Sequence, residues 1–208
     1  MIYPGPLTPQ QRRESQKNYA IFGVINGLSY MCLGETVIIL FAVRLNASNA
    51  MIAVLGSMLY FSFILLPLGK VVAAHVGAAR SQSIFWTLRN MAALVVAASS
   101  IVAYAGYPEA ALLQVLIGAC GFYGFRAAGA VMIQPLLGDI ATPEERSELV
   151  GRSNALFYAG SVAALLAIWG VFRLYDTIWA LTGIIVIGAC LGVTSTRYIR
   201  RIDETAAL

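Results

Sequence analysis

The chain has 208 residues, of which 59% are hydrophobic and 12% are charged, and its formal net charge is +4. A soluble domain carries about 25% charged residues, so this composition excludes an ordinary soluble globular protein and indicates a membrane protein. The positive charge would suit a nucleic-acid-binding protein, but the placement of the basic residues argues against that class. The lipid bilayer is therefore the first expected partner.

Residues 1–18 form a polar N-terminal tail that we expect in the cytoplasm. A segment this polar is not a cleaved signal peptide. Thr8, Pro9 and Gln11 match a helix start, with Thr8 as the cap, Pro9 in the first turn and Gln11 completing a capping box. We expect a short helix at the membrane surface here.

Six apolar segments follow, each long enough to cross the hydrocarbon core as a helix. They cover residues 19–43, 49–76, 83–105, 110–136, 149–172 and 177–197. Runs of this length do not match the ten-residue alternating strands of a membrane barrel, and helices satisfy their own backbone groups in lipid. The sequence predicts an all-α membrane protein with a six-helix bundle over 19–197 and, over 198–208, a cytoplasmic C-terminal tail or the start of a linker.

The basic residues predict the orientation of the bundle. With the N-terminus inside, the inner loops and tails hold ten Lys and Arg residues, whereas the outer turns hold two, Arg44 and Arg173. We therefore expect a multi-pass protein of a bacterial inner membrane with both termini in the cytoplasm. The basic isoelectric point then reflects topology, and no nucleic-acid partner is expected.

Two ionisable side chains lie well inside the first and fourth spans, Glu35 and Arg126. A charge at mid-bilayer costs about 2.5–3.5 kcal/mol on insertion scales, so it indicates a wet cavity or an internal pair. Either Arg126 holds an anionic group while Glu35 carries a proton or couples a cation, or the two pair to fix the packing of their spans. Tyr123 lies one turn from Arg126 on the same helix face.

Asn26 and Tyr30 are four residues apart and share a face of the first span. Glu35 lies nine residues beyond Asn26, about half a turn away, so one straight helix cannot direct both into one cavity. A distortion at Gly27 or Gly34 would allow it. For Asn26, a packing role and a ligand-binding role are both open.

Several other polar or small residues have ordinary interpretations. Arg89 lies near the inner end of the third span, and we expect its side chain to extend to the lipid headgroups. Gly188 and Gly192 form a GxxxG pattern in the sixth span, which permits close helix packing. His75 has no partner cluster, so no metal site is expected. Without nucleotide or catalytic motifs, we expect neither a cofactor nor an enzyme.

Motifs around the fourth span point to a family. Arg126 is followed by QPLLGDI at 134–140, by PEER at 143–146 and by Gly151, and the first turn reads RLNAS at 44–48. This arrangement, with six spans, resembles the N-terminal half of the major facilitator superfamily. The resemblance implies two inverted three-helix repeats, a substrate cavity lined by the first and fourth spans, and transport by alternating access.

Two departures concern the inner gate and the chain length. The family has an aspartate four residues after a glycine between spans two and three, whereas residues 69–80 here contain no acid. The residues that we name as cytoplasmic gate candidates are Asp139, Arg146, Gly69 and Arg80. Family members have about twelve spans, so the chain is either half of a longer protein or a half-size protein that needs a partner.

The resemblance implies secondary-active transport of a small solute, and Arg126 with Glu35 favours an anionic or zwitterionic solute and proton coupling. A second six-helix half, from another copy or a different chain, would complete the cavity. Spans two and five would make that contact, helped by the small residues Gly56, Ser57, Gly160 and Ser161. The alternative is a non-transporting scaffold or assembly subunit of a larger membrane complex, which the missing aspartate favours.

Overall fold

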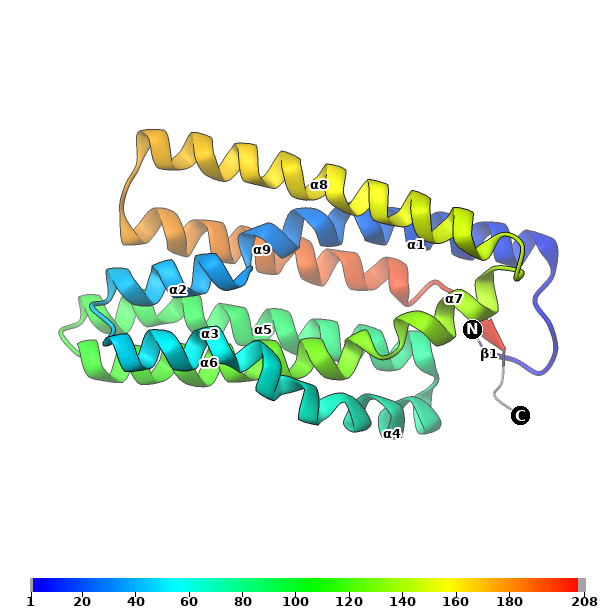
Figure 1. Cartoon of the computed structure of the whole chain (residues 1–208), viewed down its shortest axis with the longest axis horizontal. Coiled ribbons are helices and arrows are strands. Elements are labelled where there is room, and N and C mark those ends of the chain that lie inside the picture. The colour runs from blue at the N-terminus through cyan, green and yellow to red at the C-terminus, as the bar shows by residue number, and fades with distance from the viewer. Residues whose placement is uncertain (1, 206–208) are drawn as a thin grey trace.

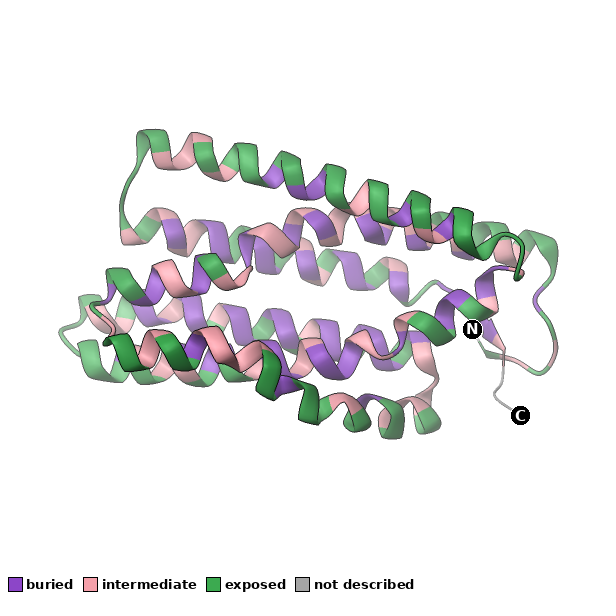
Figure 2. Ribbon diagram, viewed as in Figure 1, coloured by how far each residue is buried: buried purple, intermediate pink, exposed green. Residues whose placement is uncertain are grey.

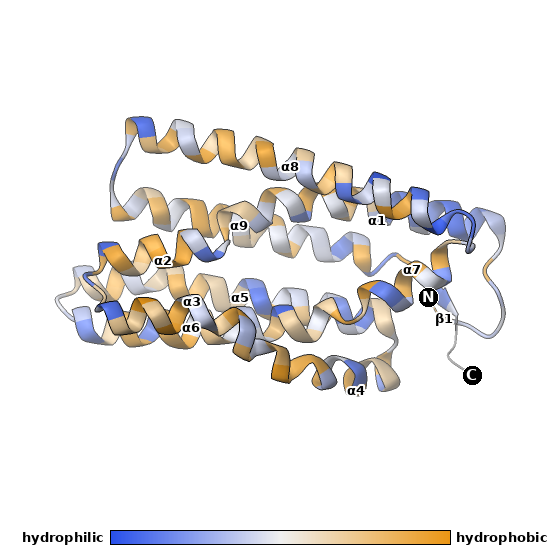
Figure 3. Cartoon of the chain, viewed as in Figure 1, coloured by the Kyte–Doolittle hydropathy of each residue, from blue (hydrophilic) through white to orange (hydrophobic). Residues whose placement is uncertain are grey.

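The computed structural model describes residues 2–205, which form one elongated helical bundle (Figure 1). Figure 3 shows apolar residues along the helices and polar residues gathered towards the loops. Six segments are long and apolar enough to cross a membrane, which confirms the six predicted helices. These segments are Pro9–Arg44, Asn49–Val76, Ala78–Tyr104, Pro108–Ile140, Arg146–Leu174 and Ile178–Ile199.

The first helix begins at Pro9 rather than near residue 19. The capping box explains this start: the Gln11 N–H donates to Thr8 Oγ1 over 3.3 Å, and the Thr8 N–H donates to Gln11 Oε1 over 2.8 Å. The capping box is therefore confirmed. The expected separate surface helix is wrong, because the polar residues are the first turns of a longer helix that continues into the span.

The first span is interrupted at one of the two glycines that the sequence indicated. α1 (Pro9–Cys32) and α2 (Glu35–Arg44) are separated at Gly34, whose backbone is extended (φ −61°, ψ 160°). Glu35 therefore occupies the first turn of α2, where the helix dipole favours a carboxylate.

The second and fourth spans are interrupted as well. The second consists of α3 (Asn49–Phe61), the 3₁₀ turn η1 (Ser62–Leu65) and α4 (Leu66–Val76). The fourth consists of α6 (Pro108–Ala130) and α7 (Ile133–Ile140). The remaining spans are continuous helices, namely α5 (Ala78–Tyr104), α8 (Arg146–Leu174) and α9 (Ile178–Ile199).

The helices pack in five main pairs. α1 lies along α8 and α9, α6 lies along α5 and along the second span, and α5 lies along α9. The core is the region where α2, α5, α6 and α9 meet, and it contains the fully buried Phe41, Val96, Val115 and Ile185. The GxxxG pattern packs closely as predicted: a Cβ on Gly188 would lie 2.4 Å from Cys32 Cβ.

Two of the small residues expected to contact a second half are used inside the chain. A Cβ on Gly160 would lie 2.5 Å from the Val24 carbonyl oxygen, so α8 packs directly on the α1 backbone there. The Ser161 hydroxyl donates to the Gly27 carbonyl oxygen over 3.4 Å. The expectation for Gly160 and Ser161 is therefore wrong, because both face α1 and are buried.

The second and fifth spans are nevertheless the exposed edges of the bundle. Figure 2 shows α8 and α4 along opposite edges, with largely exposed surfaces. In an 18-residue apolar stretch of each span, only 11% of the residues are buried in the second span and 17% in the fifth, against 56% in the third. Large apolar side chains cover both edges, including Phe61, Ile64, Leu166 and Trp169.

Both ends of the described chain lie together at one end of the bundle, which we call the terminal end (Figure 1). There β1 (Ile2–Tyr3) pairs in parallel with β2 (Glu204–Thr205). This pairing was not predicted, because neither segment resembles a strand in the sequence. At the opposite end, the turns between spans contain Asn46 (φ 60°) and Gly106 (φ 91°) in the left-handed region.

Candidate functional site

A cavity of about 410 Å³ lies between α1, α5, α6 and α8. Aromatic side chains form part of its wall, among them Phe22, Trp86 and Phe157. Its polar lining residues come from all four helices: Asn26, Tyr30, Arg89, Arg126, Ser153, Asn154 and Tyr158. The cavity is open to one side of the bundle, where Asn154 and Tyr158 are exposed, and it places polar groups among apolar walls.

The cavity brings together three of the five residues named from the sequence, Asn26, Tyr30 and Arg126. Glu35 does not line it: its Oε1 lies on the side of α3, 3.6 Å from where a Cβ on Gly56 would be. Tyr123 is 1% exposed and does not line it either, and its hydroxyl is without a hydrogen-bond partner.

Arg126 contacts one tyrosine in two ways. Its Nη2 donates to the Tyr30 hydroxyl over 3.3 Å, and its Cζ lies 4.9 Å from the centre of the same ring. A cation over an aromatic face is attracted by the ring quadrupole. Tyr30 is held in turn by Phe157, whose ring centre lies 5.5 Å away. Arg126 forms no ion pair with Glu35. The alternative in which these two residues pair to fix the packing of their spans is therefore not the arrangement in this structure.

The prediction that the Arg89 side chain extends to the lipid headgroups is wrong. Arg89 lies eleven residues beyond the start of α5, about 16 Å along the axis at 1.5 Å per residue, and is 1% exposed. It does not extend to headgroups, because its guanidinium turns inwards and donates to amide oxygens of Asn26 (3.4 and 3.5 Å) and Asn90 (3.3 Å). Its Cζ also lies 4.8 Å from the Trp86 ring centre.

Asn26 joins α1 to α5 as well as lining the cavity. Its Oδ1 accepts from the indole Nε1 of Trp86 over 3.0 Å and from both terminal nitrogens of Arg89. The signal that could have identified Arg89 as a cavity residue is its neighbour Asn90, a second polar residue at the same depth. The Asn90 Nδ2 donates to the Trp86 carbonyl oxygen over 2.6 Å.

The cavity therefore has an uneven charge balance. Arg89 and Arg126 both line it, and no carboxylate of residues 2–205 forms an ion pair with either. The Arg89 Nε is buried without a hydrogen-bond partner. A buried charge is normally paired, so two guanidinium groups held by neutral oxygens form an anion-binding arrangement.

A second polar cluster at the terminal end links Glu204 and Thr205 to the start of α5 and to Asp139. Asp139, a gate candidate, accepts the Thr205 hydroxyl over 2.6 Å and the Thr205 N–H over 3.3 Å. Glu204 is 4% exposed, and its Oε2 accepts the N–H groups of Ala78 (2.6 Å) and Ala79 (3.1 Å) at the start of α5. Burial raises the pKa of Glu204, and the two N–H donors offset part of that increase.

Glu204 supplies a carboxylate close to the loop where the sequence lacks one. The loop ends at Gly77 (φ 89°), and a Cβ there would lie 2.2 Å from Glu204 Oε1. Sequence reasoning missed Glu204 because it lies in the C-terminal tail. The available signal was indirect: α5 begins after Gly77, which has no side chain to cap the helix.

The other gate candidates are arranged differently from one another. Gly69 allows α4 to touch α6, since a Cβ there would lie 1.9 Å from the Ala128 carbonyl oxygen. Arg80 and Arg146 are exposed, and neither forms an ion pair with Asp139. The tail, rather than these arginines, makes the contacts of Asp139.

Comparison with protein-family models, with curated proteins and with solved structures found no match for this chain. Within residues 2–205, no group of three or more His, Cys, Asp or Glu side chains could hold a metal ion. The cavity is therefore the feature of the molecule from which a function is inferred.

Proposed function

We propose that the chain is a six-helix half of a secondary transporter of the major facilitator type, which moves a small solute by alternating access. The observation that carries this proposal is the polar cavity with Arg89 and Arg126 at mid-span. Charged side chains at membrane depth are expensive and mark solute or ion pathways. The cavity also lies between the first and fourth spans, as the resemblance to that superfamily implies.

The packing of the spans supports an inverted repeat. An inverted repeat exchanges the first, second and third spans with the fourth, fifth and sixth. Under this exchange the pair α1–α9 becomes the pair α6–α5, and the pair α1–α8 becomes the pair of α6 with the second span. The pair α5–α9 maps onto itself. Such symmetry is typical of transporters built from inverted three-helix repeats.

The interruptions of the first and fourth spans support the same repeat. α1 has 24 residues before its break and α6 has 23. Discontinuous helices in corresponding positions of two repeats are typical of transporter binding sites.

A second six-helix half completes this proposal. The exposed edges at the second and fifth spans are the surfaces for it, and its arrival would close the cavity that α1, α6 and α8 leave open. With Gly160 and Ser161 buried against α1, the contact falls on exposed side chains such as Phe61 and Leu166. Cysteines placed at these two positions, in a background without native cysteines, are expected to cross-link two copies.

Uptake by vesicles tests the function. We expect purified chain in vesicles to take up an anionic solute, and Arg126→Ala to lower uptake to that of protein-free vesicles while insertion stays intact. Arg197→Ala is the matched control, because Arg197 is exposed at the end of α9. Normal uptake by Arg126→Ala would remove this residue from the mechanism.

The double variant Arg126→Leu with Glu35→Leu separates transport from packing. Because Glu35 lies beside α3 rather than in the cavity, we expect the double variant not to recover uptake. Recovery of folding and uptake together would show that the two residues only pair. Stable assembly into a larger complex without uptake of any solute would instead support the non-transporting subunit.

A further inference from the structure

The two cavity arginines are held one helical turn apart. Arg89 contacts Asn26 and Arg126 contacts Tyr30, and these two partners are four residues apart on α1, about 6 Å along the axis. Both guanidinium groups line the same cavity. A ligand of only a few atoms can therefore reach both.

Part of their hydrogen-bonding capacity is unused, although Arg89 already makes three hydrogen bonds. A guanidinium has five N–H donors, yet Arg126 makes one hydrogen bond, to Tyr30, and the Arg89 Nε makes none. The hydrogen bonds of both side chains span 3.3–3.5 Å and end on neutral oxygens. Hydrogen bonds between a guanidinium and an anionic oxygen are shorter, about 2.7–2.9 Å.

The charges of the two arginines indicate the valence of a ligand that would fit the cavity. Two like charges close together in a bundle of low polarity repel each other and favour neutralisation. A monoanion would leave one charge unbalanced, whereas a dianion balances both. Ser153, Asn154 and Tyr158 on α8 supply neutral polar groups across the cavity.

We propose that Arg89 and Arg126 together bind a small dianion whose charges lie on oxygen atoms, such as a short dicarboxylate or inorganic phosphate. Arg126 is only partly buried and meets the ligand first, while the buried Arg89 fixes its inner end. The dianion is then the transported solute, a conclusion that rests on the proposed function.

Calorimetric titration of the purified full chain in neutral detergent tests the site. The probes are succinate, its monomethyl ester, which has similar length and one charge, and inorganic phosphate. We expect succinate to bind at least about tenfold more tightly than the ester, since a hydrogen-bonded charge contributes a factor of this order. Equal affinity for succinate and ester, or binding of neither succinate nor phosphate, would overturn the proposal.

Variants assign the binding to the two arginines. Arg89→Gln and Arg126→Gln are each expected to weaken succinate binding about 10- to 100-fold, and Arg197→Gln is expected to leave it unchanged. If Arg89→Gln fails to fold, Arg89→Lys is tested instead. Lysine keeps the positive charge but lacks the two parallel N–H donors of a guanidinium, so this variant still reports on the site. Unchanged affinity in folded Arg89 and Arg126 variants would contradict the proposal.

Two further arms separate the ligand from its alternatives. Added phosphatidylglycerol that displaces succinate would assign the site to a lipid headgroup and overturn the solute assignment. Succinate binding without uptake in vesicles would keep the dianion site and reject the transport function. Uptake of a neutral solute without any dianion binding would reject the site and keep transport.

Discussion

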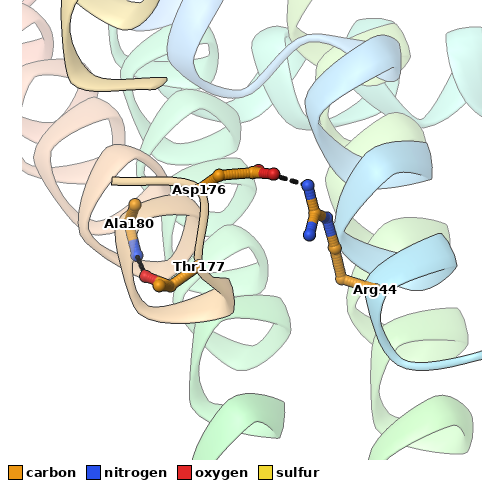
Figure 4. A network of polar contacts seen from close by, with 4 residues as sticks. All are labelled: Arg44, Asp176, Thr177 and Ala180. Atoms are coloured by element: carbon orange, nitrogen blue, oxygen red, sulfur yellow. Dashed lines mark hydrogen bonds and ion pairs between the residues drawn. The ribbon is translucent and has the colours of Figure 1, made fainter. Parts of the chain in front are cut away.

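Arg44 and Arg89 show how differently one kind of side chain is held at the edge and in the middle of this bundle. Arg44 ends α2, and its Nη2 donates to Asp176 Oδ1 in the turn before α9 (Figure 4). Both side chains are exposed, at 38% and 65%. Arg89 is 1% exposed and donates only to amide oxygens.

Burial decides which of these two charges indicates a function. An exposed charge is solvated by water, so its ion pair contributes little and needs no further partner. A buried guanidinium has lost its water, and within residues 2–205 no carboxylate forms an ion pair with Arg89 to replace it. The unbalanced charge at Arg89 is therefore informative, whereas the visible ion pair at Arg44 is not.

The largest expected effect concerns the sidedness of the two ends. Given the distribution of basic residues, a cysteine at exposed Asn46 should react fully with an impermeant reagent in intact cells, and one at exposed Glu145 should not. The exposed native cysteines Cys120 and Cys190 must be replaced first. Labelling of Glu145→Cys from outside would reverse the orientation and place Arg44 in the cytoplasm.

Ser81 is unsuitable as an inner-face reporter, although its position in the sequence suggests it. It is fully buried, and its hydroxyl donates to the Gly69 carbonyl oxygen over 3.1 Å. A cysteine there would be protected by packing on either side of the membrane.

The next prediction compares the thermal stability of variants at Asn26 and at Arg89. Asn26→Leu removes the acceptor of Trp86 and Arg89, and leaving buried donors unsatisfied costs about 1–3 kcal/mol each. Arg89→Met removes an unpaired charge, so we expect unchanged or increased thermal stability, because apolar replacements of buried charges are often neutral or stabilising. Thermal unfolding in detergent measures both. A strongly destabilised Arg89→Met would show that the charge is already balanced within the chain.

The sequence was sufficient for the parts of the fold that depend on local composition. Six long apolar runs predicted six helices, and Thr8 with Gln11 predicted the first cap, because both signals lie within a few residues. Gly34 was one of two glycines at which a distortion would let Asn26 and Glu35 face one cavity. The break lies at Gly34, but Glu35 does not line the cavity. The extended conformation of Gly34 depends on the neighbouring helices.

The parts that failed depend on contacts between distant residues. Arg89 looked like a lipid-facing residue because its acceptor Asn26 lies 63 positions away. Glu204 could not be assigned to the start of α5 because that contact spans 126 positions. Gly160 was placed on the wrong surface since a small residue permits close packing without indicating the neighbour.

A smaller effect is expected at Glu204. Replacing it with Ala removes the cap of α5 and should destabilise the bundle by about 1 kcal/mol. Because burial raises its pKa, its contribution is fully present below the ordinary glutamate pKa, about 4.3, and is lost as the pH rises through the raised folded value. The neighbouring Asp139 carboxylate raises the pKa further.

The measurement is the difference in melting temperature between wild type and Glu204→Gln as a function of pH. The variant keeps an acceptor oxygen for one N–H but cannot titrate, so this difference should decline from acid to neutral pH. A difference that grows with pH would mean that the N–H donors outweigh the effect of burial.

The smallest effect is expected at the exposed ion pair. The hydrogen bond from Arg44 lowers the pKa of Asp176, so the contribution of this carboxylate is present above the ordinary aspartate value, about 3.9, and is lost as the pH falls through the lowered folded pKa. Salt screens exposed charges, so Arg44→Gln, Asp176→Asn and the double variant should all melt within error of the wild type at physiological salt. A double-variant cycle at low and high salt measures the coupling. A clear coupling that survives high salt would mean that Arg44 is as strongly held as a buried charge, and the contrast with Arg89 would then fail.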